Sequence, residues 1–257
     1  MTNKNDKQPR FKIPDECFGV PKEGSIERAL AEAEQHSQQP QTTMPITSSG
    51  DYWEIPNVEY RNGIYRVRLL KTLLDNGNAK TQGDWIEYSK QARQKGEFYL
   101  GNMAFQYSTF KALSQQNTPE AIEARDFIRS QMRGKWLMTT TRLRYNPNGV
   151  DEVIHGYTMP DELKMNVGLV APDRFVTQED SKVLEALLLE SDFIKVNQVF
   201  NFINGTNAYV WRLNSKPETT SERVAGFLAG SVRALLYCYR DPSLQYQGLG
   251  VFSVAPN

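Results

Sequence analysis

The order of hydrophobic and polar positions divides the chain into a helical part followed by a strand-rich part. Residues 64–69 alternate with a period of two, which predicts a half-buried strand. Apolar residues then recur at helical spacing, and we expect helices at about 83–95, 103–115 and 119–133. The last helix is the best defined, because Thr118 suits an N-cap and proline follows it at the first helical position.

A β-hairpin is predicted after these helices. Its strands would span 136–145 and 150–157, and the Asn148-Gly149 pair between them favours a tight hairpin turn. A further short strand is expected at 165–170.

The remainder of the chain contains two more helices and then only strands. Thr177 and Asp180 form a capping pair before an apolar run at helical spacing, and a second helix is expected at 192–203. Strands are predicted at 207–214, 222–229, 233–241 and 249–255. Helices first and a β-rich C-terminal half indicate the α+β class rather than a parallel α/β fold.

Composition separates an N-terminal arm from a folded domain. Residues 1–50 are rich in Gln, Ser, Thr, Pro and Lys, with one short helical stretch at about 25–36. Such a composition predicts a flexible arm. The domain is expected at 51–257, where aromatic and β-branched residues first arrive together.

Hydropathy and charge argue against two classes of partner. The longest apolar runs, such as 183–189 and 224–228, are far shorter than the ~20 residues that cross a bilayer. The N-terminus lacks the apolar core of a secretory signal, so we expect a cytoplasmic protein, with display on a surface or virion left open. Lys plus Arg and Asp plus Glu number 30 each, so no single-signed field attracts nucleic acid, and none is expected as partner.

Few residues suit catalysis or metal binding. The two histidines, His36 and His155, have no neighbours at ligand spacing, so we predict no metal and no cofactor. His155 is interpreted as a half-buried strand residue or a turn-stabilising donor. Cys17 and Cys238 lie near opposite ends and are expected to be free thiols. Phosphate-binding and hydrolase motifs are absent, so no catalytic residue is predicted.

One segment has an unusual composition. The 21 residues from Val224 to Leu244 contain no Lys, Glu, Gln, Met or Trp. These five types make up 59 of the 257 residues, so about five would be expected in such a window. A buried strand also avoids Lys, Glu and Gln, so the deficit alone is weak support for any function.

The segment resembles the variable proteins of diversity-generating retroelements, whose C-terminal region is rewritten by a reverse transcriptase at template adenines. The resemblance rests on residues 207–216 and 222–256. In that family Asn codons of the template become codons ending in a pyrimidine, which cannot encode the five missing types. Family members resemble C-type lectins of the formylglycine-generating-enzyme type. The resemblance therefore implies a C-type lectin-like domain with a helical N-terminal portion, a β-rich C-terminal half and a variable region at about 224–246.

Two features of the family are only partly matched. Trp211 resembles the Trp of a V-W motif that precedes the variable strands, and the resemblance implies a role in core packing. The family's closing G-F-R or G-V-R motif corresponds to Gly250-Val251-Phe252, in which Phe stands in place of the Arg.

The family pattern divides the segment into fixed and diversified positions. The fixed set corresponds to Phe227, Ala229, Ser231, Arg233, Leu236, Cys238, Arg240, Pro242, Leu249 and Gly250. The diversified, ligand-binding set corresponds to Leu228, Gly230, Val232, Ala234, Leu235, Tyr237, Tyr239, Asp241, Leu244 and Tyr246.

Strand geometry gives this division a structural meaning. Residues two apart share one face of a strand, so fixed residues can hold the core while variable residues face a ligand. Tyr237 and Tyr239 are then expected side by side on the exposed face, where their replacement by Ala should hardly change the melting temperature. Their amphipathic rings suit a protein ligand better than a bare sugar.

We therefore expect a non-enzymatic receptor or display protein with a retroelement-diversified surface. Three alternatives stay open. The strand pair could be interior, although Arg233, Arg240 and Asp241 argue against a core position. The chain could be an enzyme related to formylglycine generation, but that chemistry uses paired C-terminal cysteines and Cys238 stands alone. It could also be a structural or virion component with a fixed interaction face.

Overall fold

The computed structural model of the chain describes residues 44–156, 163–169, 173–211 and 217–254. Residues Met44–Asn257 form one unit. Of the arm predicted at 1–50, residues 1–43 lie outside the described residues, whereas Ile46 is buried in the core. The helical stretch expected at 25–36 and Cys17 also lie outside the described part.

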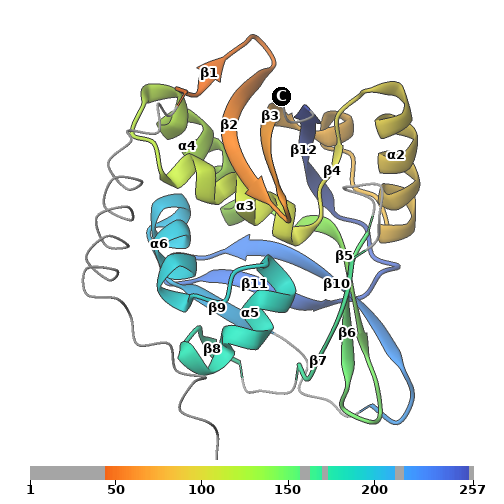
Figure 1. Cartoon of the computed structure of the whole chain (residues 1–257). Coiled ribbons are helices and arrows are strands. Elements are labelled where there is room, and N and C mark those ends of the chain that lie inside the picture. Colours follow the sequence, from red (N-terminus) through yellow and green to blue (C-terminus); the bar gives the residue numbers. More distant parts are fainter. Residues whose placement is uncertain (1–43, 157–162, 170–172, 212–216, 255–257) are drawn as a thin grey trace, which may run out of the picture. The chain divides into compact units, whose positions relative to one another are not determined.

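Alternating residues build one mixed sheet with twelve strands (Figure 1). In spatial order its main path runs β1 (Thr47–Ser48), β2 (Tyr52–Tyr60), β3 (Gly63–Leu73), β12 (Gln247–Val254), β5 (Leu137–Tyr145), β10 (Ser221–Ala229), β11 (Ala234–Arg240), β9 (Ala208–Trp211) and β8 (Arg174–Phe175). Off this path, β4 (Tyr99–Leu100) pairs with β12, and β6 (Asp151–His155) pairs with both β5 and β7 (Leu163–Val167). Most pairs are antiparallel, but β9 with β11 and β5 with β12 are parallel.

Side-chain caps delimit the helices, which are α2 (Gln82–Lys95), α3 (Met103–Ser114), α4 (Pro119–Gly134), α5 (Ser181–Leu188) and α6 (Phe193–Asn204). Thr118 accepts a hydrogen bond from the Ala121 N–H at the start of α4, as predicted. Thr177 and Asp180 form the expected capping box before α5. At the end of α6, Gly205 adopts φ 78°, so the chain leaves the helix in a left-handed turn.

The described residues have a mixed α and β architecture, which confirms the general class but does not test its lectin-like identity. Every predicted helix within them is present, and so is the hairpin turn at Asn148 and Gly149. The sequence analysis did not predict β2 or the short strands β1, β4 and β8. Among the described residues, no helix is long and apolar enough to cross a bilayer.

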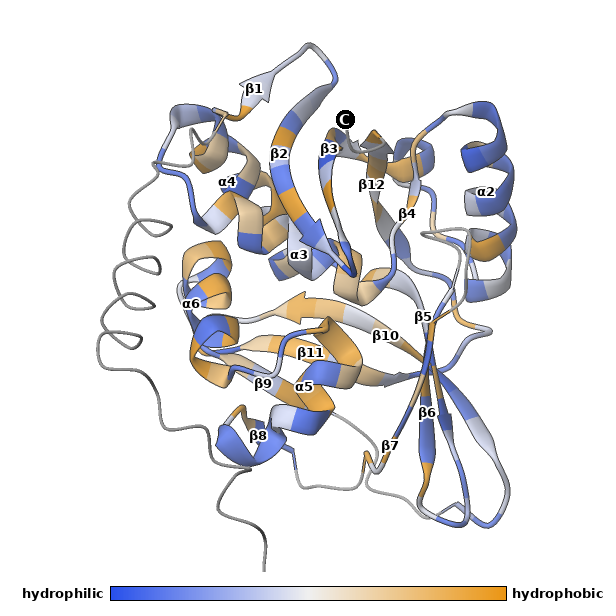
Figure 2. Ribbon diagram, in the orientation of Figure 1, coloured by the Kyte–Doolittle hydropathy of each residue, from blue (hydrophilic) through white to orange (hydrophobic). Residues whose placement is uncertain are grey.

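Helices cover one face of the central strands. Phe227 on β10 is fully buried, and its ring lies 5.4 Å from Phe110 on α3 and 6.1 Å from Phe200 on α6. Figure 2 shows hydrophobic residues concentrated on β9, β10, β11 and α5, whereas α2 is mainly hydrophilic. We call the helix-covered side of β9, β10 and β11 the inner face.

His155 links the sheet to this helical layer. Its ring is 1% exposed, and Nε2–H donates to the Ala186 carbonyl of α5 at 2.8 Å while Nδ1 accepts from the Thr141 hydroxyl at 2.9 Å. Burial lowers the pKa of His155 to about 4. His155 is thus a strand residue, as predicted, but it is fully buried rather than half-buried, and it donates to a helix rather than to a turn.

Gly226 lets β10 and β5 approach closely. A Cβ at this position would lie 2.6 Å from the backbone oxygen of Leu137. Gly226→Ala should therefore destabilise the fold by about 1–3 kcal/mol, because backbone must move to relieve the overlap. Gly134→Ala, where a Cβ meets nothing within 4 Å, is the matched control and should change stability by less than about 1 kcal/mol. Urea unfolding of both variants measures the difference, and equal stabilities would contradict the close approach.

The buried histidine predicts a loss of stability in acid. Its pKa of about 4 lies below the ordinary 6.5, so the neutral ring stabilises the fold above pH 6.5. This contribution, up to about 3 kcal/mol, should be lost as the pH falls from 6.5 towards 4. His155→Gln keeps a donor but does not titrate, so the difference in unfolding free energy between the wild type and this variant should shift in the variant's favour over that window. A pH-independent difference would contradict the assignment.

Candidate binding face

Alternation on β11 places two sets of side chains on opposite sides of the sheet. Ala234, Leu236 and Cys238 are each 0% exposed and lie on the inner face. Leu235, Tyr237 and Tyr239 point the other way, with exposures of 8%, 9% and 40%. The same alternation holds on β9, where Ala208 and Val210 are buried and Tyr209 and Trp211 are half-buried.

A β-bulge brings Arg240 to the outer face as well. Gly226 pairs with Tyr237 but Val224 pairs with Arg240, so β11 carries one extra residue between these pairs. An extra residue reverses the alternation beyond it. The Arg240 guanidinium consequently lies 3.7 Å from the centre of the Trp136 ring and 5.1 Å from the Tyr237 ring.

Aromatic rings form a continuous row across the outer face. The Tyr237 ring is at its centre. Its centroid lies 4.1 Å from that of Trp136, in an edge-to-face contact, and 5.8 Å from that of Trp211, in a stacked contact. The row extends over Tyr209 to Phe175 on β8, over Trp136 to Tyr246, and along β11 to Tyr239. Burial raises the pKa of Tyr237, and Arg240 opposes this shift.

Three arginines lie over these rings. Arg233 is 4.7 Å from the centre of Tyr209 and 5.6 Å from that of Trp211, and Arg223 is 5.5 Å from that of Tyr239. We define the aromatic–arginine face as Trp136, Phe175, Tyr209, Trp211, Arg223, Arg233, Tyr237, Tyr239, Arg240 and Tyr246. Its members come from four strands of the sheet, from the β10–β11 turn and from the segments beside β5 and β12.

Polar contacts fix the two ends of this face. The β10–β11 turn is held by Asn204, whose amide donates to the Gly230 carbonyl at 3.1 Å while its oxygen accepts from Arg133 at 2.9 Å. Near the other end, the Tyr246 carbonyl accepts from the Trp85 indole N–H at 2.8 Å. The face is thus supported by α4, α6 and α2.

The predicted diversified positions are only partly outward. Val232, Tyr239 and Leu244 are 70%, 40% and 48% exposed. Gly230 and Asp241 are also exposed, and Leu228 and Tyr246 are half-buried. These positions lie on the outer face or at its rim.

Three of the predicted diversified positions require correction. Ala234 is fully buried, because adjacent residues of a strand cannot share a face and Leu235 takes the outward direction. Leu235 and Tyr237 point outward but are covered by their neighbours, Tyr237 by Trp136 and Trp211. Tyr237 is therefore the centre of the outer layer and not a free surface side chain.

The predicted fixed positions divide in a similar way. Six are buried as expected, namely Phe227, Ala229, Leu236, Cys238, Leu249 and Gly250. Ser231 is exposed at the turn, and Arg233, Arg240 and Pro242 are half-buried. Trp211 does not pack in the core, because it lies on the outer face against Tyr237.

The sequence analysis did not predict that Trp136, Phe175 and Tyr209 belong to this face. They lie far from Tyr237 in sequence and reach it only through the order of the strands in the sheet. For Tyr209 and Trp211 the alternation with the apolar residues Ala208 and Val210 could have indicated that both rings point to the same face of the strand.

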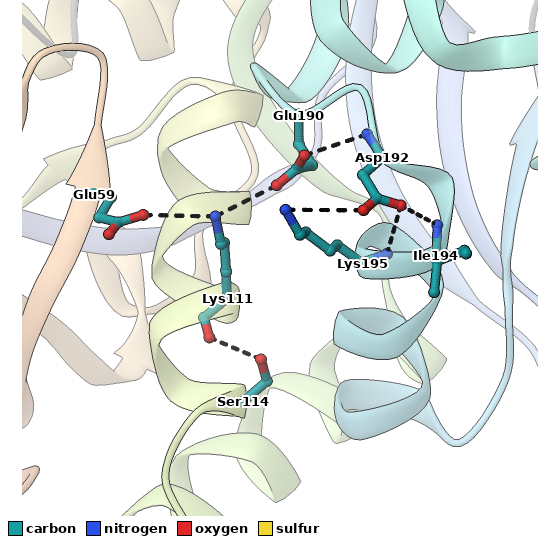
Figure 3. Close-up of polar contacts among 7 residues, drawn as sticks. All are labelled: Glu59, Lys111, Ser114, Glu190, Asp192, Ile194 and Lys195. Carbon is teal, nitrogen blue, oxygen red and sulfur yellow. Dashed lines mark hydrogen bonds and ion pairs between the residues drawn. The ribbon is translucent and has the colours of Figure 1, made fainter. Parts of the chain in front are cut away.

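A charged cluster on the helical side has structural partners (Figure 3). Lys111 on α3 lies 3.6 Å from Glu59 and 3.4 Å from Glu190, and the Glu190 carboxylate also accepts from the Asp192 N–H. Asp192 caps α6. These groups connect β2, α3 and the α5–α6 link, which accounts for their positions without a ligand.

A hollow of about 710 Å³ lies beside β3, α2 and the 3-10 turn η2 (Leu74–Gly77). Its wall includes Asp75, Tyr88 and Glu97. The Asp75 carboxylate accepts from the Lys80 ammonium at 2.6 Å, which lowers the pKa of Asp75. In the described part of the chain, no group of three or more His, Cys, Asp or Glu side chains gathers to hold a metal ion.

Comparison with known proteins gives no relative. No protein-family model, no curated protein and no solved structure matches the chain. The chemistry of the aromatic–arginine face is therefore interpreted from its own geometry.

The packing separates two tyrosines that were expected to behave alike. Tyr237→Ala should destabilise the fold by about 2–4 kcal/mol, because it removes a ring enclosed by Trp136 and Trp211. Tyr239→Ala should cost less than about 1 kcal/mol, since its ring is 40% exposed. Thermal and urea unfolding measure both, and a small loss for Tyr237→Ala would show that its ring is not enclosed.

Proposed function

We propose that the chain is a non-enzymatic binding protein that recognises a protein partner through its aromatic–arginine face. One observation carries the proposal: seven aromatic rings and three arginines from distant parts of the chain gather on the side of the sheet opposite α3 and α6. A contiguous group of aromatic rings that is partly open to solvent is typical of an interaction surface.

The residue types favour a protein ligand. Tyr, Trp and Arg are the types most enriched at the energetic centres of protein interfaces. Their rings and guanidinium planes give a large contact area at a low cost in side-chain entropy. Tyr237, already enclosed, would act as a rigid support for the more exposed Tyr239, Phe175 and Val232.

A diversified surface remains part of the proposal. In this reading the scaffold is a C-type lectin-like domain whose buried Phe227, Leu236 and Cys238 are constant, while the rim positions Leu228, Val232, Tyr239 and Leu244 vary among copies. The exposures of these rim positions support it, because substitutions there leave the core intact. The buried Ala234 is not proposed as variable.

A catalytic role has little support from the described residues. Their one histidine, His155, is neutral and enclosed between Thr141 and Ala186. Their one cysteine, Cys238, is buried on the inner face, away from the aromatic–arginine face. These positions argue against both a proton-transfer site and a thiol enzyme of the formylglycine-generating type.

Sequencing the gene deeply across a natural population tests diversification. We expect codon variation at 228, 232, 239 and 244, constant codons at Phe227, Leu236 and Cys238, and a downstream near-repeat with a linked reverse transcriptase. Uniform codons at 228, 232, 239 and 244 would rule out diversification. They would leave the second candidate, a structural protein with a fixed interaction face, which needs the same aromatic–arginine face but one defined partner.

A further inference from the structure

We propose that Arg240 and Arg233 make the aromatic–arginine face a receptor for acidic side chains, so that the partner presents Asp or Glu residues to two cationic positions. This inference rests on the proposed function and names the chemistry of the ligand. It is carried by the lack of an ion pair to either arginine among the residues that the structure describes, and by the ring contacts that hold Arg240.

Arg240 lies over three rings but has no ion-pair partner among the described residues. Its guanidinium carbon lies 3.7 Å from the centre of Trp136 and 5.1 Å from the centres of both Tyr237 and Tyr246. Nε is shielded from solvent and has no hydrogen-bond partner within the described residues. Rings compensate part of a guanidinium charge, but an anion compensates more, particularly at a partly desolvated site.

The nearest acidic residue in sequence is occupied elsewhere. Asp241 accepts hydrogen bonds from the Ser243 N–H at 2.8 Å and the Ser243 hydroxyl at 2.7 Å. These bonds lower the pKa of Asp241. Among the residues that the structure describes, no carboxylate forms an ion pair with Arg240 or with Arg233.

Several cations that stack on rings elsewhere in the described chain have carboxylate partners. Arg68 over Tyr52 pairs with Glu54 at 3.0 Å. Arg125 over Phe202 pairs with Asp126 at 2.8 Å. Arg240 and Arg233 differ from these two arginines, because no carboxylate of the described residues pairs with them.

The rings of Trp136, Tyr237 and Tyr246 hold the Arg240 guanidinium in place. A planar guanidinium fixed on a ring keeps its outer N–H groups in one direction, which suits two parallel hydrogen bonds to a carboxylate. Arg233, fixed over Tyr209 and Trp211, gives a second such position on the same face.

A titration of the full chain by NMR tests the Arg240 position directly. Sodium glutarate is the probe, and glutaramide, of the same shape but neutral, is its control. We expect the Arg240 Nε–H resonance to shift saturably with glutarate and not with glutaramide. The Arg125 Nε–H resonance should stay unchanged, because Asp126 already accepts from it at 2.9 Å. No shift at Arg240, or equal shifts with both compounds, would overturn the inference.

Selection from a randomised dodecapeptide display library separates this inference from the proposed function. We expect peptides that bind wild type but not Trp211→Ala to be rich in Asp and Glu, and to bind Arg240→Gln about tenfold more weakly. Arg125→Gln is the matched control and should bind them normally. Face-dependent peptides without acidic residues, bound equally by Arg240→Gln, would overturn the anion receptor and leave the face standing. If no peptide depends on the face for binding, both the inference and the proposed function are overturned. If oligothymidine binds instead, and its binding depends on Arg240, the proposal of a protein partner is overturned.

Discussion

The enclosure of Tyr237 between Trp136 and Trp211 is the interaction on which the outer face depends. It joins β11 to β9 on one side and to the start of β5 on the other, and it gives Arg240 a ring to lie on. Without this central ring the pair Trp136 and Tyr246 would have no ring contact with the group Trp211, Tyr209 and Phe175. The enclosed tyrosine therefore turns separate surface residues into one rigid surface.

The two sides of the central strands have different roles because a strand directs alternate residues to opposite faces. On the inner face Phe227, Leu236 and Cys238 are excluded from water by helices. On the outer face the rings pack mainly against one another, and arginines cover them. A surface of this kind can change its rim without disturbing the core, which suits a binding protein and gives a physical basis for diversification.

Local structure could be predicted from the sequence because its causes are local. Thr118 at the start of α4, the Asn148-Gly149 turn and Gly205 after α6 each act through neighbouring residues. The order of the strands could not be predicted, because β12 inserts between β3 and β5 through pairings between distant segments. The same limit applies to the site: alternation correctly put Leu236 and Cys238 inside, but Tyr237 is covered by tryptophans that no local pattern connects to it.

The central claim is that the aromatic–arginine face is open to solvent in the full chain, and hydroxyl-radical footprinting measures this most directly. The account predicts rapid oxidation of Phe175, Tyr239 and Leu244, at rates far above those of the buried Trp53 and Trp85. Protection of Phe175 and Tyr239 to the level of Trp53 in the free protein would contradict it, because a face closed to water cannot receive a partner.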